Sequence, residues 1–261
     1  MIIDVEGKSV YAEAGGAGHA SHCVMFLHGA GMDHSIWSTF GSALDARRFQ
    51  WLAPDYPGHG QSEGPALGRV EDLSVWLHGL INSLGLKEVS LVGHSMGGLL
   101  AMEYASIHPG LLRGVSLIAS GLATPVNPAL LEMARTEPLR AAELVVKWSF
   151  AGGDNSRNSS LATRVMSTNA ASVLAIDLKA CDDYQNGKNA AAAVNCPAQV
   201  ILGELDRMVP SEAGTKLSGQ LQESELQVVA GSGHMVPLEN PTECRSLLEN
   251  FLGRHSAEGS I

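Results

Sequence analysis

The stretch that decides the fold is VSLVGHSMGGLLAM, residues 89–102. An apolar run ends at Gly93, the pattern G-x-S-x-G follows over residues 93–97, and an unbroken helix-forming run comes directly after it. A serine between two such glycines is typical of a sharp strand-to-helix turn, because a side chain at either glycine would collide with neighbouring backbone. The turn places Ser95 at a helix N-terminus, where the next N–H can stabilise an oxyanion. The pattern therefore predicts that Ser95 is a nucleophile.

The same pattern occurs a second time, around Ser62 at residues 60–64. Ser62 follows the turn-rich sequence PGHG at 57–60, and the Gly-Pro pair at 64–65 starts no helix directly after it. We therefore expect Ser62 to cap a turn through its hydroxyl rather than to carry chemistry.

Short apolar runs recur on both sides of the Ser95 stretch, and each ends in turn residues. Alternating residues around Gly7 predict an N-terminal hairpin over residues 2–13. Six further strands are expected at residues 23–27, 49–53, 89–92, 115–118, 199–202 and 226–229, with helices such as 70–84 and 98–108 between them. Short buried strands that alternate with helices indicate an α/β fold with a mostly parallel sheet flanked by helices.

One interval breaks this alternation. Between residues 121 and 193 no strand-like run occurs, and apolar residues recur at helical spacing. The pattern predicts three or four helices inserted between two late strands. Such an insertion cannot lie in the sheet, so we expect residues 121–193 to form a helical cap over one end of a core made of residues 1–120 and 194–261.

A nucleophilic serine needs a base and an acid that orients the base. Asp206 lies in the loop after the strand at 199–202, and His234 follows the last expected strand. Because the carboxyl ends of parallel strands meet at one edge of the sheet, both side chains are expected near Ser95. Glu204 is the rival acid, but its position closer to the strand favours packing or loop capping.

The chain has ten histidines, so His234 has rivals as the base. Three lie in motif turns, where structural hydrogen bonding is expected: His28, His59 and His94. Six others are expected on surfaces or in loops: His19, His22, His34, His78, His108 and His255. His234 is therefore the predicted base.

Five segments together resemble the α/β-hydrolase superfamily, in its capped, single-domain bacterial form. They are HGAGMDHSIW at 28–37, APDYPGHGQS at 53–62, GHSMGG at 93–98, LGELDRMVP at 202–210 and GSGHMVPLENP at 231–241. They occur in the order that the family shows. The resemblance implies that Ser95 is the nucleophile, His234 the base and Asp206 the residue that orients it.

The resemblance also implies an oxyanion hole made by the backbone N–H groups of Ala30 and Met96. The strand-to-helix turn at Ser95 is called the nucleophile elbow. The loop after the first core strand faces this elbow, and Gly31 or Met32 are alternatives to Ala30. Serine at the elbow argues against dehalogenases and epoxide hydrolases of this fold, which use aspartate there. The loop HGAGMD also lacks the HGGGPGA-like run typical of meta-cleavage C–C hydrolases, and Ala30 stands where haloperoxidase-like perhydrolases often have Trp.

These residues predict a serine hydrolase that cleaves carboxylic esters of small apolar acids through an acyl-enzyme. Enol-lactone, thioester or C–C bond hydrolysis by the same residues is the alternative, as is a slow-turnover small-molecule receptor. Large apolar residues of the cap and of the two catalytic loops are expected in the substrate pocket: Met133, Trp148, Met166, Met208 and Met235. Three acidic residues of the last cap segment are candidates to face that pocket: Asp177, Asp182 and Asp183.

Composition excludes several other classes of function. The net charge is −10 and no basic face stands out, which argues against binding to nucleic acid or to an anionic membrane surface. No phosphate-binding loop, dinucleotide fingerprint or metal-ligand cluster is visible, so no cofactor and no metal are expected. Four widely spaced cysteines, no signal peptide and no transmembrane run predict buried free thiols and a cytoplasmic protein.

Overall fold

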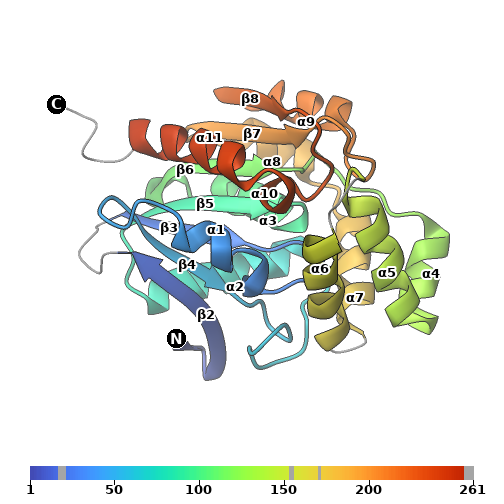
Figure 1. Cartoon of the computed structure of the whole chain (residues 1–261). Coiled ribbons are helices and arrows are strands. Elements are labelled where there is room, and N and C mark those ends of the chain that lie inside the picture. Colours follow the sequence, from blue (N-terminus) through green and yellow to red (C-terminus); the bar gives the residue numbers. More distant parts are fainter. Residues whose placement is uncertain (17–21, 153–155, 170–171, 256–261) are drawn as a thin grey trace.

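An eight-stranded sheet forms the centre of the molecule (Figure 1). The structure, a computed structural model, describes residues 1–16, 22–152, 156–169 and 172–255. The strand order is β1-β2-β4-β3-β5-β6-β7-β8, in which β1 and β2 form an antiparallel hairpin, β2 pairs antiparallel with β4, and all other pairs are parallel. The strands are β1 (Ile2–Val5), β2 (Lys8–Gly16), β3 (His22–Leu27), β4 (Gln50–Pro54), β5 (Glu88–His94), β6 (Leu112–Ile118), β7 (Ala198–Gly203) and β8 (Ser224–Val229). The expected hairpin, the six further strands and the mostly parallel sheet are confirmed.

Helices cover both faces of the sheet, because successive side chains of a strand point to opposite faces. In β3, which is buried at every position, Met25 packs on the face covered by α2, α3, α8 and α9, and Phe26 packs on the face of α1, α10 and α11. Figure 1 shows α1 and α11 in front of the sheet. Outside the insertion after β6, the helices are α1 (Ser38–Ser42), α2 (Val70–Ser83), α3 (Met96–Ile107), α9 (Ser211–Ser218), α10 (Val236–Glu239) and α11 (Pro241–Arg254), with short 3-10 turns η1 (His34–Ile36) and η2 (Pro109–Leu111).

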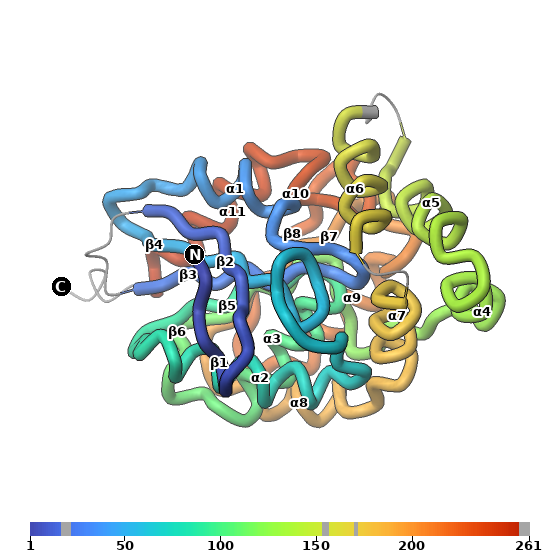
Figure 2. The backbone as a smooth tube through the Cα atoms, turned by 90° about the horizontal axis from the view of Figure 1, so that it is seen from below, coloured from blue at the N-terminus to red at the C-terminus, as the bar shows by residue number. Residues whose placement is uncertain are grey.

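The insertion between β6 and β7 contains five helices in the described residues, more than the three or four expected. They are α4 (Pro128–Thr136), α5 (Pro138–Ser149), α6 (Ser156–Thr168), α7 (Val173–Asp183) and α8 (Gly187–Ala193). The first four gather at one end of the sheet (Figures 1 and 2). The fifth packs against α3, with Ala190 and Ala191 in the same apolar cluster. The predicted cap range 121–193 thus includes a helix that packs with the core, and this division of the chain stays a prediction.

The burial of His22 differs from what the sequence predicts. His22 was expected on a surface or in a loop, and this is wrong, because β3 begins one residue earlier than predicted and buries the ring. Its Nε2 lies 2.8 Å from Ser90 Oγ on the neighbouring strand. His19 lies outside the described residues.

The four cysteines carry free thiols, of which Cys196 is half-buried and the other three are buried. None of the described helices has the length and apolar character needed to cross a membrane.

Candidate active site

Ser95 occupies the tight turn between β5 and α3, with φ 55° and ψ −115°. A positive φ at a residue other than glycine is strained, so surrounding contacts must hold it. The Ser95 N–H donates to the Ile118 carbonyl of β6 at 2.9 Å. A Cβ built on Gly93 would lie 2.1 Å from the Gly97 oxygen, and one built on Gly97 would lie 2.2 Å from the Leu27 oxygen. Backbone contacts therefore require both glycines of the motif.

Ser62 is part of a turn and is fully engaged in hydrogen bonds there. Its hydroxyl donates to the Asp55 carbonyl at 2.8 Å and accepts from the Tyr11 N–H at 2.9 Å. The hydroxyl of Ser62 thus ties the loop after β4 to β2, which is the capping role expected for it.

Asp206 and His234 come together although 28 residues separate them along the chain. Asp206 lies in the loop after β7 and His234 in the loop after β8, and both are buried. His234 Nδ1 lies 2.8 Å from Asp206 Oδ2, while Asp206 Oδ1 accepts from the N–H groups of Met208 at 2.8 Å and Val209 at 2.9 Å. Because the carboxylate can only accept at neutral pH, His234 donates from Nδ1 and leaves Nε2 free to act as a base.

The environment of Asp206 keeps the carboxylate ionised. Burial by itself raises its pKa, but the adjacent His234 and the hydrogen bonds to the carboxylate outweigh burial and lower the pKa below its ordinary value. The rival acid Glu204 is exposed, and its Oε2 accepts from the Gly231 N–H at 2.9 Å. Glu204 therefore caps the loop that precedes His234, as its position near the strand indicated.

Ser95 and His234 both line a cavity of about 220 Å³ between the sheet and helices α4 to α7. Its inner wall is apolar and buried, and it includes Met32, Leu130, Val145, Met166, Leu178 and Val209. Exposed residues form the rim, namely Pro125, Asn127, Trp148 and Arg207. The cavity therefore offers an apolar interior that ends at Ser95 and His234, with an exposed entrance that includes Asn127 and Arg207.

The structure separates the five residues that were predicted for the pocket. Trp148, Met166 and Met208 line the cavity. Met133 and Met235 do not line it. The Met235 side chain is fully buried in the core, and Met133 is half-buried against the same apolar cluster, one turn along α4 from Leu130, which does reach the cavity.

None of the three acidic residues of α7 lines the cavity. Asp182 Oδ1 accepts from the Val126 N–H at 3.0 Å, and Asp183 forms an exposed ion pair with Lys179. Asp177 is buried against the loops of the core. The expectation that these carboxylates face the pocket is therefore wrong, because each is turned toward a partner elsewhere.

Sequence reasoning missed most of the residues that line the cavity, and two of them are Arg207 and Cys181. Arg207 directly follows Asp206, and Cys181 belongs to the apolar stripe of α7. Adjacency to the predicted acid was the available signal for Arg207. For Cys181 the helical pattern alone does not tell which side of the stripe faces the cavity.

The backbone beside Ser95 offers two N–H groups suited to an oxyanion. Ala30 lines the cavity, and Met96 is the first residue of α3, where N–H groups lack acceptors within the helix. Neither N–H has a hydrogen-bond partner among the described residues. The alternatives to Ala30 are occupied, since Gly31 N–H donates to Asp177 Oδ2 at 2.7 Å and Met32 N–H donates to the Gly29 carbonyl at 3.2 Å.

Two buried histidines brace the site through the backbone. His94 Nε2 donates to the His234 carbonyl at 2.9 Å, and burial lowers the pKa of His94 to about 3. His28 Nδ1 donates to the Gly29 carbonyl at 3.0 Å, and burial lowers the pKa of His28 to about 4. Both rings are therefore neutral at physiological pH and fix the loops that carry His234 and Ala30.

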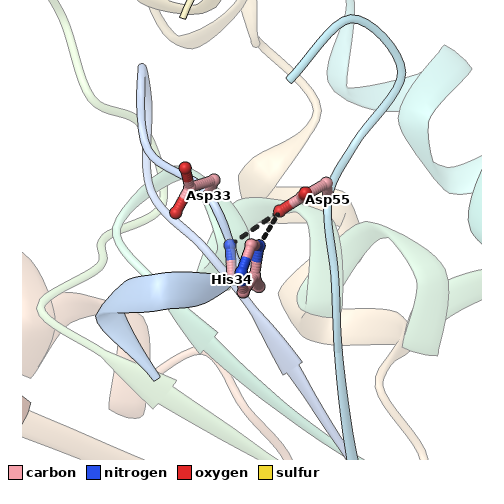
Figure 3. A group of neighbouring side chains, drawn as sticks. All are labelled: Asp33, His34 and Asp55. Carbon is pink, nitrogen blue, oxygen red and sulfur yellow. Dashed lines mark hydrogen bonds and ion pairs between the residues drawn. The ribbon is translucent and has the colours of Figure 1, made fainter. Parts of the chain in front are cut away.

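Figure 3 shows the one group among the described residues with spacing that fits a metal ion, Asp33, His34 and Asp55. Asp55 Oδ1 accepts from both the backbone N–H and Nδ1 of His34, at 2.8 and 2.7 Å, and Asp55 Oδ2 accepts from the Gln61 N–H at 2.9 Å. Asp33 caps η1 by accepting from the Ser35 N–H. These oxygens already hold the loops after β3 and β4 together, which is a structural role.

The parallel sheet, the strained serine after β5 and the aspartate-bound histidine after β8 define the class of protein. The chain belongs to the alpha/beta hydrolase family, whose family model matches residues 24–247. It is a hydrolase of the α/β-hydrolase type.

Three proteins are similar to this chain over most of its length. It is 27% identical over 248 residues to the 2-hydroxymuconate semialdehyde hydrolase of Pseudomonas putida, covering 89% of this chain and 88% of that protein. The enol-lactonase of Burkholderia xenovorans superposes with a TM-score of 0.90 at 23% identity, covering 97% of this chain and 100% of that one. The esterase of Exiguobacterium antarcticum superposes with a TM-score of 0.89 at 20% identity, covering 97% and 99%. The two structural matches show a shared fold.

Proposed function

We propose that the chain is a serine hydrolase that cleaves carboxylic esters of small apolar acids. Ser95 is the nucleophile, His234 the base and Asp206 the residue that orients the base. One observation carries the proposal: a strained serine and an aspartate-bound histidine converge on one largely apolar cavity. A structural role for these side chains would require neither the strain nor the convergence.

In the proposed mechanism, Ser95 Oγ attacks the ester carbonyl carbon while His234 Nε2 takes the hydroxyl proton. The resulting oxyanion accepts hydrogen bonds from the N–H groups of Ala30 and Met96. The C–O bond to the alcohol then breaks as His234 returns its proton to the leaving oxygen. His234 then takes a proton from a water molecule, whose oxygen attacks the acyl carbon. The bond from that carbon to Ser95 Oγ breaks as His234 returns the proton to Oγ, and the acid is released.

The size and lining of the cavity support small apolar acyl groups. The inner wall, which includes Leu130, Met166 and Leu178, has no formal charge and is buried. A carboxylate placed against this wall would lose its hydration without gaining a partner, whereas an alkyl chain is stabilised by burial. The acyl group therefore occupies the inner wall, and the alcohol points to the rim.

Arg207 supports a second class of substrate. It is the only Lys, Arg, Asp or Glu side chain that lines the cavity in the described part of the chain, and it lies at the exposed rim. A substrate with an apolar body and a carboxylate at its outer end would pair with this guanidinium while still in contact with water. The Pseudomonas putida relative is a 2-hydroxymuconate semialdehyde hydrolase, and a muconate semialdehyde contains a carboxylate. A carboxylated enol-lactone or vinylogous diketone, cleaved with the same three residues, is the alternative substrate.

A panel of nitrophenyl esters, thioesters, enol-lactones and vinylogous diketones tests the proposal. We expect multiple turnovers on short-chain esters, whereas a receptor would release about one product molecule per chain. Ser95→Ala should lower kcat by at least ~10³-fold. Ser62→Ala, the matched control, should leave kcat within about threefold of wild type. Ester turnover by Ser95→Ala at the wild-type rate would remove Ser95 as nucleophile.

Arg207→Gln separates the two substrate classes. If the outer end of the substrate carries a carboxylate, the variant should lose roughly fivefold in kcat/KM on carboxylated substrates and keep its activity on neutral esters, because one exposed charge pair is worth about 1 kcal/mol. Equal effects on both substrate sets would leave the neutral ester as the better assignment.

We also propose a cytoplasmic location and a small-molecule substrate as the partner. The free thiols of all four cysteines support the location, since reducing compartments keep thiols unpaired. The net charge of −10 disfavours binding to nucleic acid.

A further inference from the structure

Asp177 connects the cap to two loops of the core. It lies on α7 and is almost completely buried. Its Oδ2 accepts from the Gly31 N–H at 2.7 Å and from His59 Nε2 at 2.8 Å. His59 Nδ1 in turn lies 3.0 Å from the Pro57 carbonyl, which can only accept. Both ring nitrogens of His59 therefore donate, and His59 and Asp177 form a buried ion pair.

Asn169, which follows α6, holds the same two loops from a second position in the cap. Its Oδ1 accepts from the Gly60 N–H at 2.7 Å. Its Nδ2 donates to the carbonyls of Gly31 at 2.9 Å and Met32 at 3.2 Å. The N–H and the carbonyl of Gly31 are thus both bound by cap side chains, one by Asp177 and the other by Asn169.

Gly31 directly follows Ala30, whose N–H is the proposed oxyanion donor. The peptide between them is planar, so fixing the Gly31 N–H also fixes the direction of the Ala30 carbonyl and thereby restricts the backbone that carries the Ala30 N–H. Gly31 has φ +69°, and a Cβ at this position would lie 2.9 Å from Leu174 Cδ1 of α7. The loop therefore lies directly against the cap and depends on it for its conformation.

Stability alone is a poor explanation for the Asp177 contacts. The second carboxylate oxygen, Oδ1, is buried and has no hydrogen-bond partner among the described residues. A buried ion pair is commonly no more stabilising than apolar residues of similar volume, because both charges lose their hydration. The ion pair instead fixes orientation, because it holds the loops that contain Gly31 and His59 at defined positions.

We propose that the cap is a working part of the oxyanion hole, in which Asp177 and Asn169 are positioning residues that hold residues 29–32 so that the Ala30 N–H points at the reacting carbonyl. This inference rests on the proposed function of Ser95. It assigns the cap a second role besides covering the substrate, and any displacement of α7 would then weaken catalysis as well as binding.

The test measures kcat and KM on nitrophenyl butyrate, the rate of labelling by an alkyl fluorophosphonate, and the melting temperature. The phosphonate reacts with an activated serine and needs the same oxyanion donors, but it does not depend on the identity of the natural substrate. The variants are Asp177→Ala, Asp177→Asn and Asn169→Ala. Asp183→Ala is the matched control, because Asp183 lies on the same helix but is exposed.

We expect Asp177→Ala and Asn169→Ala to lower kcat and the labelling rate by roughly 10- to 100-fold with KM within about threefold, as for misplacement of an oxyanion donor. Asp177→Asn keeps an acceptor for the Gly31 N–H and should restore part of kcat. Asp183→Ala should match wild type.

The outcomes separate a failure of the proposed function from a failure of the positioning role alone. If wild type reacts with neither the ester nor the phosphonate, the proposed function fails and this inference fails with it. If wild type reacts but Asp177→Ala and Asn169→Ala keep kcat and labelling within about threefold, only the positioning role is wrong. If Asp177→Ala does not fold, the same criterion applies to Asp177→Asn and Asn169→Ala. A lower melting temperature with unchanged kcat per folded molecule also overturns the inference.

Discussion

Replacing Asp206 by asparagine tests the proposed triad most sharply, because the structure dictates how the new amide must lie. Two backbone N–H groups, of Met208 and Val209, donate to Asp206 Oδ1, so the amide oxygen has to occupy that position. The amide NH₂ is then left facing His234 Nδ1, where Oδ2 now accepts at 2.8 Å. His234 must accept there and carry its proton on Nε2, the nitrogen that has to take the proton of Ser95.

The expected loss is ~10⁴-fold in kcat, which corresponds to about 5 kcal/mol of transition-state stabilisation. The fold should persist, because the amide matches the carboxylate in shape and keeps both backbone hydrogen bonds. Initial rates on nitrophenyl butyrate near pH 7 and the melting temperature measure the two effects, and ¹⁵N NMR of the imidazole reports its tautomer.

Glu204→Gln is the matched control for this prediction. Glu204 is also a carboxylate after β7, but it caps the Gly231 N–H at the surface, so its substitution should leave kcat within about threefold of wild type. The reasoning is refuted if Asp206→Asn retains kcat within about tenfold, or if the imidazole of that variant still carries its proton on Nδ1.

Other predictions concern pH, the cap and the elbow. Burial lowers the pKa of His28 to about 4 and of His94 to about 3, whereas both titrate near 6.5 when unfolded. Unfolding near pH 5 should therefore take up about two protons, and the free energy of unfolding should fall by roughly 2.7 kcal/mol per pH unit on acidification; urea titrations that show constant stability between pH 6 and 4.5 would contradict this. Met166→Ala should shift the nitrophenyl ester preference toward longer acyl chains, while Met133→Ala, outside the cavity, should keep the wild-type profile. Identical profiles for wild type and Met166→Ala would show that this wall does not shape the acyl site. Gly97→Ala would place a methyl 2.2 Å from a carbonyl oxygen of β3, so it should abolish folding or lower kcat by at least ~10²-fold; wild-type kcat would be inconsistent with this geometry.

The sheet could be predicted from the sequence because its signals are local. An apolar run of four or five residues that ends in turn residues indicates a strand, and all the expected strands are present. The signal for the turn at Ser95 is also local, because backbone atoms of the turn itself and of the adjacent strand require its two glycines. Asp206 and His234 could be placed near each other because parallel strands bring their carboxyl ends to one edge.

The residues that line the cavity were not determined in this way. Met208 lines it and Met235 does not, although both follow a predicted catalytic residue by one or two positions. Asp177 was a candidate to face the pocket and instead binds Gly31 and His59 in two distant loops. The hydropathy pattern places such a residue in the helical insertion, but it does not indicate which residues the side chain contacts.

The sequence by itself therefore determined the class of sheet, the chain order of the proposed triad residues and the existence of a helical insertion. Only the tertiary structure decided which N–H group beside Ser95 stays unoccupied, which side of each cap helix faces the cavity, and where the acids of α7 point. The physical reason is the distance along the chain over which each interaction acts. Strand and turn preferences arise within a few residues, whereas the orientation of a cap helix is set by packing against helices and loops up to 146 residues away along the chain, as in the bond between Asp177 and Gly31.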